Sequence, residues 1–523
     1  MKQLQPISIV APGFSGLNTQ DSGVTLSSDF AQVIDNCVID RYGRLGARKG
    51  WEMKTTGGSS ALGGSYIQFL MEHINADDTT VVISGGNNKL FSDGANDNAL
   101  TDITPAAYTI TQNNWKGASL YDHALIVQDG HEPIVYSEGA ATTCQTITNY
   151  LNTEKGITAT QNYGIAYPHD VLAAYGRFWV HDGETVYWST DIADTTFPAF
   201  SGGTSGMLNI AAVVPSNTDN IKAIAAHNNF LIVFCQHNIV IYKGADNPLG
   251  DFSLSDVIVG VGCIARDSVI STGTDILFLS DTGIRSLGRV IQEKSAPMRD
   301  LTKNVRDDLV SDIALNRLSD SKFNDVKAVY SEVNAFYLLS FPLSSRIYCL
   351  DMRQPLQDGS ARVTTWNAFK APAFVRRQNR DLLIGKPDGI GLYKGYDDNG
   401  DTYRMRYYSQ YLDMQSPTTI KILKQIKSTI IGGGNQTFII KTGFDFSNSF
   451  ESYAFTLGDS NYAEFGTAEY GIAEYSKGIE IDTIKSSVGG SGNIIQIAFE
   501  ADIDGKQLSV QKIDIFVKTG RTE

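Results

Sequence analysis

The sequence predicts a mainly β protein organised around a β-propeller of about seven blades. The first observation is a hairpin at residues 225–244, where two apolar runs, 230–234 and 239–242, flank a short polar turn at 236–238. Runs of β-branched and aromatic residues bounded by Asn and Gly indicate strands joined by a turn. The second observation is that strands like the second one of this hairpin recur along the chain. The third is a composition with 49 glycines and 10% aromatic residues, which is typical of a folded β protein.

The recurring strand runs into a short polar or Gly-containing turn, and successive copies lie 43 to 63 residues apart. Several copies follow an upstream apolar run, such as 178–180, 276–279 or 336–341. A period of about 40 to 50 residues with several strands is typical of propeller blades, which bury both faces only when neighbours pack on them. A row of β-sandwich hairpins is the alternative, because the pattern is degenerate and Arg285 breaks it. The seven copies align on Phe91, Tyr136, Tyr187, Tyr242, Arg285, Tyr348 and Tyr393.

The segments around the repeats lack this pattern, which suggests three parts: an N-terminal extension at 1–60, the propeller at 61–415 and a C-terminal β domain at 416–523. Inside the propeller, a helix is expected near 297–315, with Ser295 and Pro297 as its start signals. One face of this helix would carry Met298, Leu301, Val305, Leu309 and Ile313. In the C-terminal domain the strands are expected at 421–431, 438–441, 494–499 and 508–517, with a hairpin turn at Asp504-Gly505.

The N-terminal extension concentrates positive charge in a short Gly-rich segment. Arg41, Arg44, Arg48 and Lys49 lie within nine residues of one another. Such a patch could dock an acidic partner or a neighbouring subunit, or touch DNA phosphate. The alternative is a turn whose arginine stems pack along apolar surface.

The overall charge is opposite in sign, at -14. Sequence-independent binding of nucleic acid depends on Lys and Arg that neutralise phosphates, so this balance argues against a dedicated nucleic-acid binder. An acidic wall would still suit a conduit through which DNA slides without sticking, although an acidic surface also simply maintains solubility.

Other signals point away from catalysis, export and metal binding. We find neither a P-loop nor a GxSxG motif, and no pair of histidines has the spacing of a zinc helix. Residues 396–404 (YDDNGDTYR) resemble a cation loop, but Gly400 is misplaced, and a polar turn is the better interpretation. We therefore expect no enzyme activity, no cofactor and no metal. The five cysteines are far apart and are expected to be buried free thiols, and there is no signal peptide or membrane span.

Residues 11–23 (APGFSGLNTQDSG) and 35–51 (DNCVIDRYGRLGARKGW) resemble the start of tail nozzle proteins of short-tailed bacteriophages, also called tail tubular protein B-like or tail stabilisation proteins. Residues 283–309 and the closing strand at 512–521 support the resemblance. It implies a propeller-bearing structural subunit of the virion tail, assembled in the host cytoplasm as a homohexameric ring below the portal and adaptor. Its partners would be copies of itself, the adaptor, tailspike or fibre proteins, and double-stranded DNA in passage during ejection.

Two further expectations stay open. Three copies of Ala-Glu-aromatic place Glu464, Glu469 and Glu474 five residues apart. This segment is either an ordered loop with its glutamates outward, or a loop facing a neighbour or the channel. The alternative function is a propeller-type tail component that binds or cleaves a glycan of the host surface.

Overall fold

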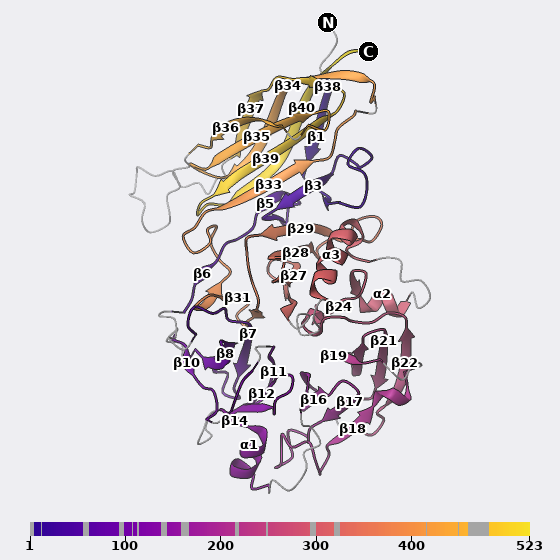
Figure 1. Ribbon diagram of the computed structural model, residues 1–523, viewed down its shortest axis with the longest axis vertical. Helices are drawn as coiled ribbons and strands as arrows, with labels where there is room; N and C mark the ends of the chain where they lie inside the picture. The colour runs from indigo at the N-terminus through magenta and orange to yellow at the C-terminus, as the bar shows by residue number, and fades with distance from the viewer. Residues whose placement is uncertain are drawn as a thin grey trace.

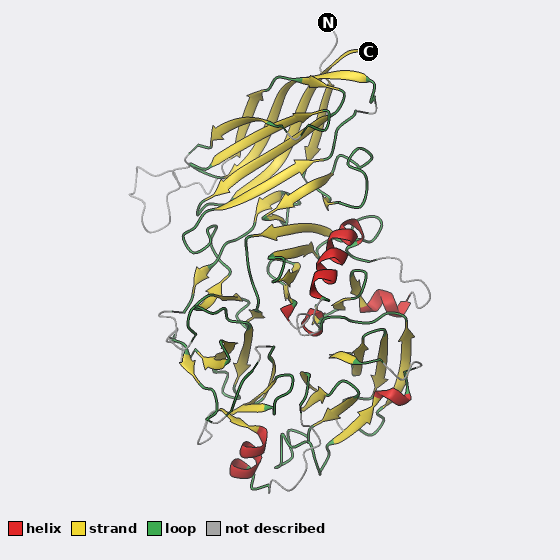
Figure 2. Ribbon diagram, viewed as in Figure 1, coloured by secondary structure: helices red, strands yellow, loops and turns green. Residues whose placement is uncertain are grey.

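The computed structural model describes residues 5–11, 13–55, 62–93, 99–106, 108–111, 114–137, 144–157, 167–214, 219–246, 249–292, 300–317, 325–414, 416–447, 449–458 and 481–522. The chain forms two β units, a ring of small sheets and a larger sandwich beside it (Figure 1). Strands dominate both units, and the helices lie around the ring (Figure 2). The chain is therefore a mainly β protein with a β-propeller, as predicted.

The ring consists of seven consecutive units, named here units 1 to 7, each an antiparallel sheet. Unit 1 holds β7 (Phe69–Ile74), β8 (Thr80–Gly86), β9 (Lys89–Ser92) and β10 (Thr101–Asp102). Unit 2 holds β11 (Lys116–Leu120), β12 (His123–Val127), β13 (Ile134–Ser137) and β14 (Cys144–Thr146). Unit 3 holds β15 (Asp170–Ala174), β16 (Arg177–His181), β17 (Thr185–Trp188) and β18 (Gly206–Asn209). Unit 4 holds β19 (Ile221–His227), β20 (Phe230–Cys235), β21 (Asn238–Lys243) and β22 (Ser253–Val259).

The remaining units complete the circle. Unit 5 holds β23 (Ile270–Ser271), β24 (Ile276–Leu279) and β25 (Ile284–Ser286), with η2 (Arg266–Ser268) before them and α2 (Leu287–Gln292) after them. Unit 6 holds β26 (Lys327–Ser331), β27 (Phe336–Phe341), β28 (Arg346–Asp351) and β29 (Arg362–Asn367). Unit 7 holds β30 (Phe374–Arg376), β31 (Leu382–Lys386), β32 (Gly389–Leu392) and, from far upstream, β6 (Glu52–Met53).

The number of full blades is six. Within the described part of the chain, six units have four strands, whereas unit 5 has three and continues into α2 where a fourth strand would lie. The expectation of about seven blades is therefore corrected, and the smaller unit 5 fills the gap between units 4 and 6. The three-stranded unit 5 is also the one in which Arg285, in β25, replaces the aromatic residue of the repeat. The ring closes where β30 contacts β7 and where β6 pairs with β32.

The repeated hairpins have the predicted form. In unit 4, β20 and β21 flank the turn at 236–237, and Phe234 is opposite Ile239. The preceding turn, at Asn228 and Asn229, has φ angles of 47° and 65°, which Asn tolerates better than most residues. The residues that define the repeat lie in the third strand of each unit, except for Tyr393, which directly follows β32.

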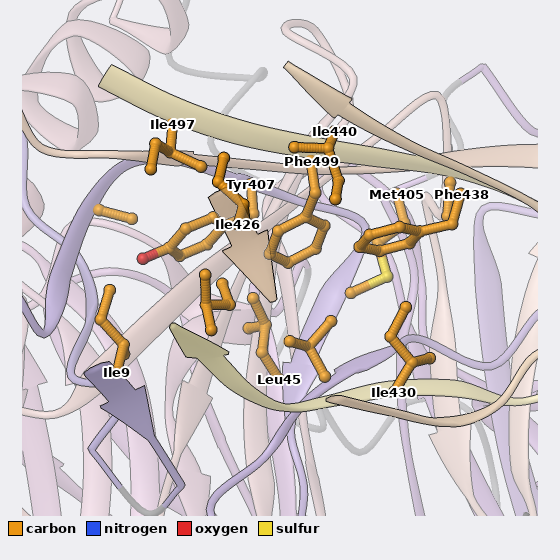
Figure 3. Close-up of a cluster of buried hydrophobic side chains, with 14 of the residues drawn as sticks. Ile9, Leu45, Met405, Tyr407, Ile426, Ile430, Phe438, Ile440, Ile497 and Phe499 are labelled. Carbon is orange, nitrogen blue, oxygen red and sulfur yellow. The ribbon is translucent and has the colours of Figure 1, made fainter. Parts of the chain in front are cut away.

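The second unit is a sandwich of two sheets. One sheet contains β1 (Gln5–Val10), β4 (Cys37–Ile39), β5 (Leu45–Ala47), β34 (Thr419–Gly432), β37 (Ile481–Ser487), β38 (Ser491–Gly492) and β40 (Leu508–Thr522). The other contains β2 (Gly16–Leu17), β3 (Phe30–Asp35), β33 (Tyr403–Ser409), β35 (Thr437–Phe444), β36 (Glu451–Thr456) and β39 (Ile495–Ile503). Both sheets contribute to one apolar core, in which Tyr407 and Phe499 stack with ring centroids 4.8 Å apart (Figure 3). The four predicted C-terminal strands correspond to β34, β35, β39 and β40.

Sheet membership divides the chain differently from the predicted domains. Residues 1–60 are not a separate extension: β1 pairs with β40, β3 pairs with β33, and β6 belongs to the propeller. The sandwich also begins earlier than residue 416, because β33 lies in it. Strand pairing between the two ends of the chain causes both differences, and local sequence does not reveal such pairing. The sandwich sheet continues into unit 6 through the pairing of Asp35 with Thr365.

The helix inserted in the propeller starts later than predicted. It is α3 (Arg306–Asn316), preceded by η3 (Lys303–Val305), and Leu301, Val305, Leu309 and Ile313 are buried as expected. The Leu301 amide donates to the carbonyl of Ile284, so the backbone at this point pairs with β25 rather than forming helix. Met298, Ser295 and Pro297 lie outside the described residues. A further helix, α1 (Ile147–Glu154), follows unit 2 and was not predicted.

Candidate functional site at the junction of the two units

The junction between the propeller and the sandwich is built around two buried cations held between aromatic rings. The order is Trp51, Lys386, Phe369, Arg48, Tyr403, and we call this set the ladder. The Lys386 ammonium lies 4.5 Å from the ring centroid of Trp51 and 4.1 Å from that of Phe369. The Arg48 guanidinium carbon lies 4.4 Å from the Phe369 centroid and 3.9 Å from that of Tyr403. Ring faces attract cations, so each ring stabilises a positive charge that is largely buried.

Several distant segments meet in the ladder. Arg48 and Trp51 lie between β5 and β6, whereas Tyr403 belongs to the sandwich strand β33. Phe369 follows β29 of unit 6, and Lys386 ends β31 of unit 7. The ladder thus connects two propeller units to the sandwich.

Arg48 is fully buried, and each of its three guanidinium nitrogens donates a hydrogen bond. Nη1 and Nη2 donate to the two carboxylate oxygens of Asp398 at 2.8 and 2.7 Å, and Nε donates to the side-chain oxygen of Asn36 at 2.9 Å. Such a two-point pair suits the planar fork of arginine. The segment must also pass very close to its neighbour, because a Cβ on Gly50 would lie 1.6 Å from the carbonyl oxygen of Asp397. The absence of a side chain at Gly50 therefore permits the junction to close.

A pocket of about 470 Å³ opens beside the ladder. The residues that line it include Trp51, Tyr66, Tyr403, Lys370 and Lys386. Lys370 lies 4.6 Å from the ring centroid of Tyr66, and Lys386 donates to the carbonyl oxygen of Lys370 at 3.2 Å. The other charged residues that line the pocket are Asp35, Asp398, Asp401, Arg404 and Arg406.

Lys386 is the unusual ionisable group of this pocket. It is 4% exposed, and burial lowers its pKa to about 7 although Asp398 opposes the shift. A lysine with such a pKa changes charge near neutral pH, which an exposed lysine does not.

The structure separates the four cations of the predicted basic patch. Arg48 is in the ladder, and Arg44, 8% exposed, pairs with Asp40 through Nε at 3.0 Å. Arg41 is exposed, and both it and Arg44 lie over the ring of Tyr42. Lys49 is half-buried, and its amide donates to the Tyr393 hydroxyl. A docking role stays a prediction, and Arg41 and Lys49 are the two of these four residues that are not buried. The alternative of arginines packed against the protein describes Arg44 and Arg48.

Two other predicted segments have different outcomes. Glu464, Glu469 and Glu474 lie outside the described residues. In the turn at 396–404, Asp398 pairs with Arg48 and the Asp397 carboxylate accepts from the amide of Gly400 at 2.8 Å. Across the described ranges, His, Cys, Asp and Glu side chains form no group of three or more that could hold a metal ion. The five cysteines are buried and free, as predicted.

A second buried cluster lies at the centre of the propeller. Asp267, in η2, pairs with Lys116 of unit 2 at 2.9 Å, with Arg266 at 3.0 Å and with Lys327 of unit 6. Arg266 also donates to the carbonyl oxygen of His169, just before unit 3, at 2.6 Å. Burial by itself would raise the pKa of Asp267, but the three cations outweigh it and hold the pKa well below the usual value. Side chains from units 2, 5 and 6 therefore meet across the centre.

Sequence reasoning identified one member of the ladder, Arg48. Trp51, Phe369, Lys386 and Tyr403 were missed, because they are spread over more than three hundred residues and no local spacing links them. The one local signal was Trp51, which closely follows the basic residues Arg48 and Lys49 and could have indicated a contact between a ring and a cation.

Comparisons with known proteins concern the propeller. No family model and no curated protein matches the chain. Among solved structures, the WD40 domain of Pan2 from Neurospora crassa is similar with a TM-score of 0.38 and 6% identity, over 66% of this chain and 94% of that one. YCF48 from Cyanidioschyzon merolae is similar with a TM-score of 0.36 and 9% identity, over 66% of this chain and 98% of YCF48. PorZ of the Porphyromonas gingivalis type-IX secretion system is similar with a TM-score of 0.33 and 12% identity, over 69% of this chain and 42% of PorZ. The description of the ring rests on strand pairing rather than on these similarities.

In the part of the chain that is described, no helix has the length and apolar character needed to cross a membrane.

Proposed function

We propose that this chain is a structural subunit of the tail nozzle of a short-tailed bacteriophage. In this proposal it forms a homohexameric ring below the portal and adaptor, in the virion tail, and extends the channel through which the genome is ejected. The ring also contacts tailspike or fibre proteins.

One observation supports this proposal most directly. Two of the segments that carry the resemblance to nozzle proteins, 35–51 and 512–521, come from opposite ends of the chain and contribute strands to the same sandwich sheet. In the sandwich, β1 and β5 both pair with β40, and residues 48–51 enter the ladder. Residues of the resembling segments thus help to hold the two β units together, as we expect for a structural building block.

The cluster at the propeller centre refines the path of DNA within this proposal. Arg266, Asp267, Lys116 and Lys327 join opposite parts of the ring, so a double helix does not pass through the propeller of a single chain. In a nozzle ring the channel lies between subunits. The net charge of -14 suits a wall along which the phosphate backbone slides.

Electron microscopy of particles that contain the chain tests the proposal. We expect a ring with several copies of the chain at the tail, between the adaptor and the distal end, around a channel bounded by more than one subunit. Light scattering of the purified chain by itself should give an assembly whose mass is a multiple of 57.0 kDa. A chain located at the periphery of the particle as a single copy per fibre would contradict the proposal.

A glycan array on the same preparation addresses the alternative function. Selective binding of a host surface glycan, or release of sugar from it, by a chain that does not enter the nozzle ring would replace our proposal with that of a receptor-binding component.

A further inference from the structure

The junction pocket has the size and position of a small-molecule site. Its volume of about 470 Å³ lies in the range of known ligand pockets, which often occur where two structural units meet. We propose that this pocket binds a small organic anion, whose carboxylate or phosphate group is held by the ammonium groups of Lys370 and Lys386. This inference is independent of the proposed role in a nozzle.

The charges that line the pocket are unequally satisfied. Asp398 is paired with Arg48, and Arg404 is paired with Glu500 and Asp502, at 2.8 Å from Nε and 2.9 Å from Nη1. These groups have little attraction left for a ligand.

The remaining charges leave an excess of positive charge. Asp35 and Arg406, directly opposite each other in the pairing of β3 with β33, contribute one charge of each sign to the lining. The other charged residues of the lining are two lysines, Lys370 and Lys386, and one carboxylate, the exposed Asp401.

The two ammonium groups lie against aromatic rings, which attract a positive charge without cancelling it. Their neighbours are the rings of Tyr66, Trp51 and Phe369, and none of these rings carries a negative charge. An ammonium group has three N–H donors, and Lys386 uses one of them on the carbonyl oxygen of Lys370. Its other donors, and those of Lys370, are available to oxygen atoms of a ligand. The aromatic side chains that share the wall give an organic anion an advantage over a bare ion, because they can pack against its apolar part.

The titration of Lys386 gives this site a characteristic pH dependence. The charged groups that face Lys386 are Asp398, which raises its pKa, and Arg48, which lowers it; Lys370, Asp35, Asp401, Arg404 and Arg406 line the same pocket. Without ligand, Lys386 loses its proton near pH 7. A bound anion favours the ammonium form, so binding above pH 7 requires uptake of a proton and becomes weaker as pH rises.

Isothermal titration calorimetry on the full chain tests the inference, with citrate and inorganic phosphate as the probes. The test variants are Lys370→Met and Lys386→Met. The control is Lys394→Met, since Lys394 is 65% exposed and pairs with Glu52 away from the pocket lining. We expect saturable binding of at least one probe at pH 6.5, and binding at least about tenfold weaker at pH 8.5. Each test variant should weaken binding by about tenfold or more, and the control should bind like the unmodified chain.

Several results would overturn the inference. It fails if neither probe binds saturably at pH 6.5, or if both test variants bind as tightly as the control. Lys370 is half-buried at the rim, so the Lys370→Met variant keeps the test valid even if Lys386→Met fails to fold. If Lys370→Met loses binding but binding to the unmodified chain does not change between pH 6.5 and pH 8.5, Lys386 does not contribute to the site. Binding of citrate alone identifies a carboxylate ligand, and binding of phosphate extends the site to phosphorylated compounds.

Discussion

The propeller centre and the junction both bury cations, but they stabilise them differently. At the centre, Arg266, Lys116 and Lys327 surround the carboxylate of Asp267. At the junction, Lys386 is held by the faces of Trp51 and Phe369, and only Arg48 has a carboxylate partner. A carboxylate cancels charge and fixes geometry, whereas a ring leaves the charge available. We infer that the centre serves stability and that the junction is the part of the molecule equipped to respond to pH or to a ligand.

Removing the carboxylate at the centre should have the largest effect. In Asp267→Asn, the buried Arg266 and Lys327 and the half-buried Lys116 lose their shared counter-charge, and we expect a loss of about 3–5 kcal/mol in the free energy of unfolding. Chemical denaturation followed by tryptophan fluorescence measures it. The matched control is Asp102→Asn, which breaks the exposed pair with Lys89 and should cost less than about 1 kcal/mol. Equal effects of the two substitutions would show that the central cluster does not contribute to stability.

The paired cation of the junction ranks second. Arg48→Met keeps an apolar stem in the ladder but leaves Asp398 without its partner, so we expect a loss of about 2–3 kcal/mol. Arg41→Met, seven residues earlier and exposed, should change stability by less than about 0.5 kcal/mol. Thermal unfolding of the two variants, recorded side by side, decides the matter. If Arg41→Met lowers the unfolding temperature as much as Arg48→Met does, the buried pair of Arg48 with Asp398 does not contribute specially to stability.

The sequence predicted the propeller better than the junction, for a physical reason. Hairpins such as β20–β21 depend on residues close in sequence, so apolar runs and turn residues reveal them. The closure of the ring by β6 and the mixing of both chain ends in the sandwich depend on pairing across hundreds of residues. Arg48 attracted attention as a charge, but its burial depends on Asp398, Phe369 and Tyr403, which local sequence could not connect to it.

The lysine without a carboxylate partner should make stability depend on pH. Lys386 has a pKa of about 7 in the folded chain, against an ordinary value of 10.5. Between these values the unfolded state binds more protons, so this lysine makes the free energy of unfolding rise with pH, by up to about 1.4 kcal/mol per pH unit. Lys386→Met should lack this rise. Comparing denaturation of both proteins at pH 7, 8 and 9 cancels the titration of groups they share, and parallel curves would contradict the lowered pKa.

The smallest effect separates a buried ring between cations from an exposed one. Phe369 lies between Lys386 and Arg48, and Tyr42 lies within reach of Arg41 and Arg44 at the surface. Replacing either ring by leucine removes the attraction but keeps an apolar side chain. We expect Phe369→Leu to cost about 1–2 kcal/mol and Tyr42→Leu less than about 0.5 kcal/mol, because water weakens a cation–ring contact at an exposed site. If thermal unfolding shows the two losses to be equal, then packing volume rather than charge explains Phe369, and aromatic rings do not replace carboxylates at the junction.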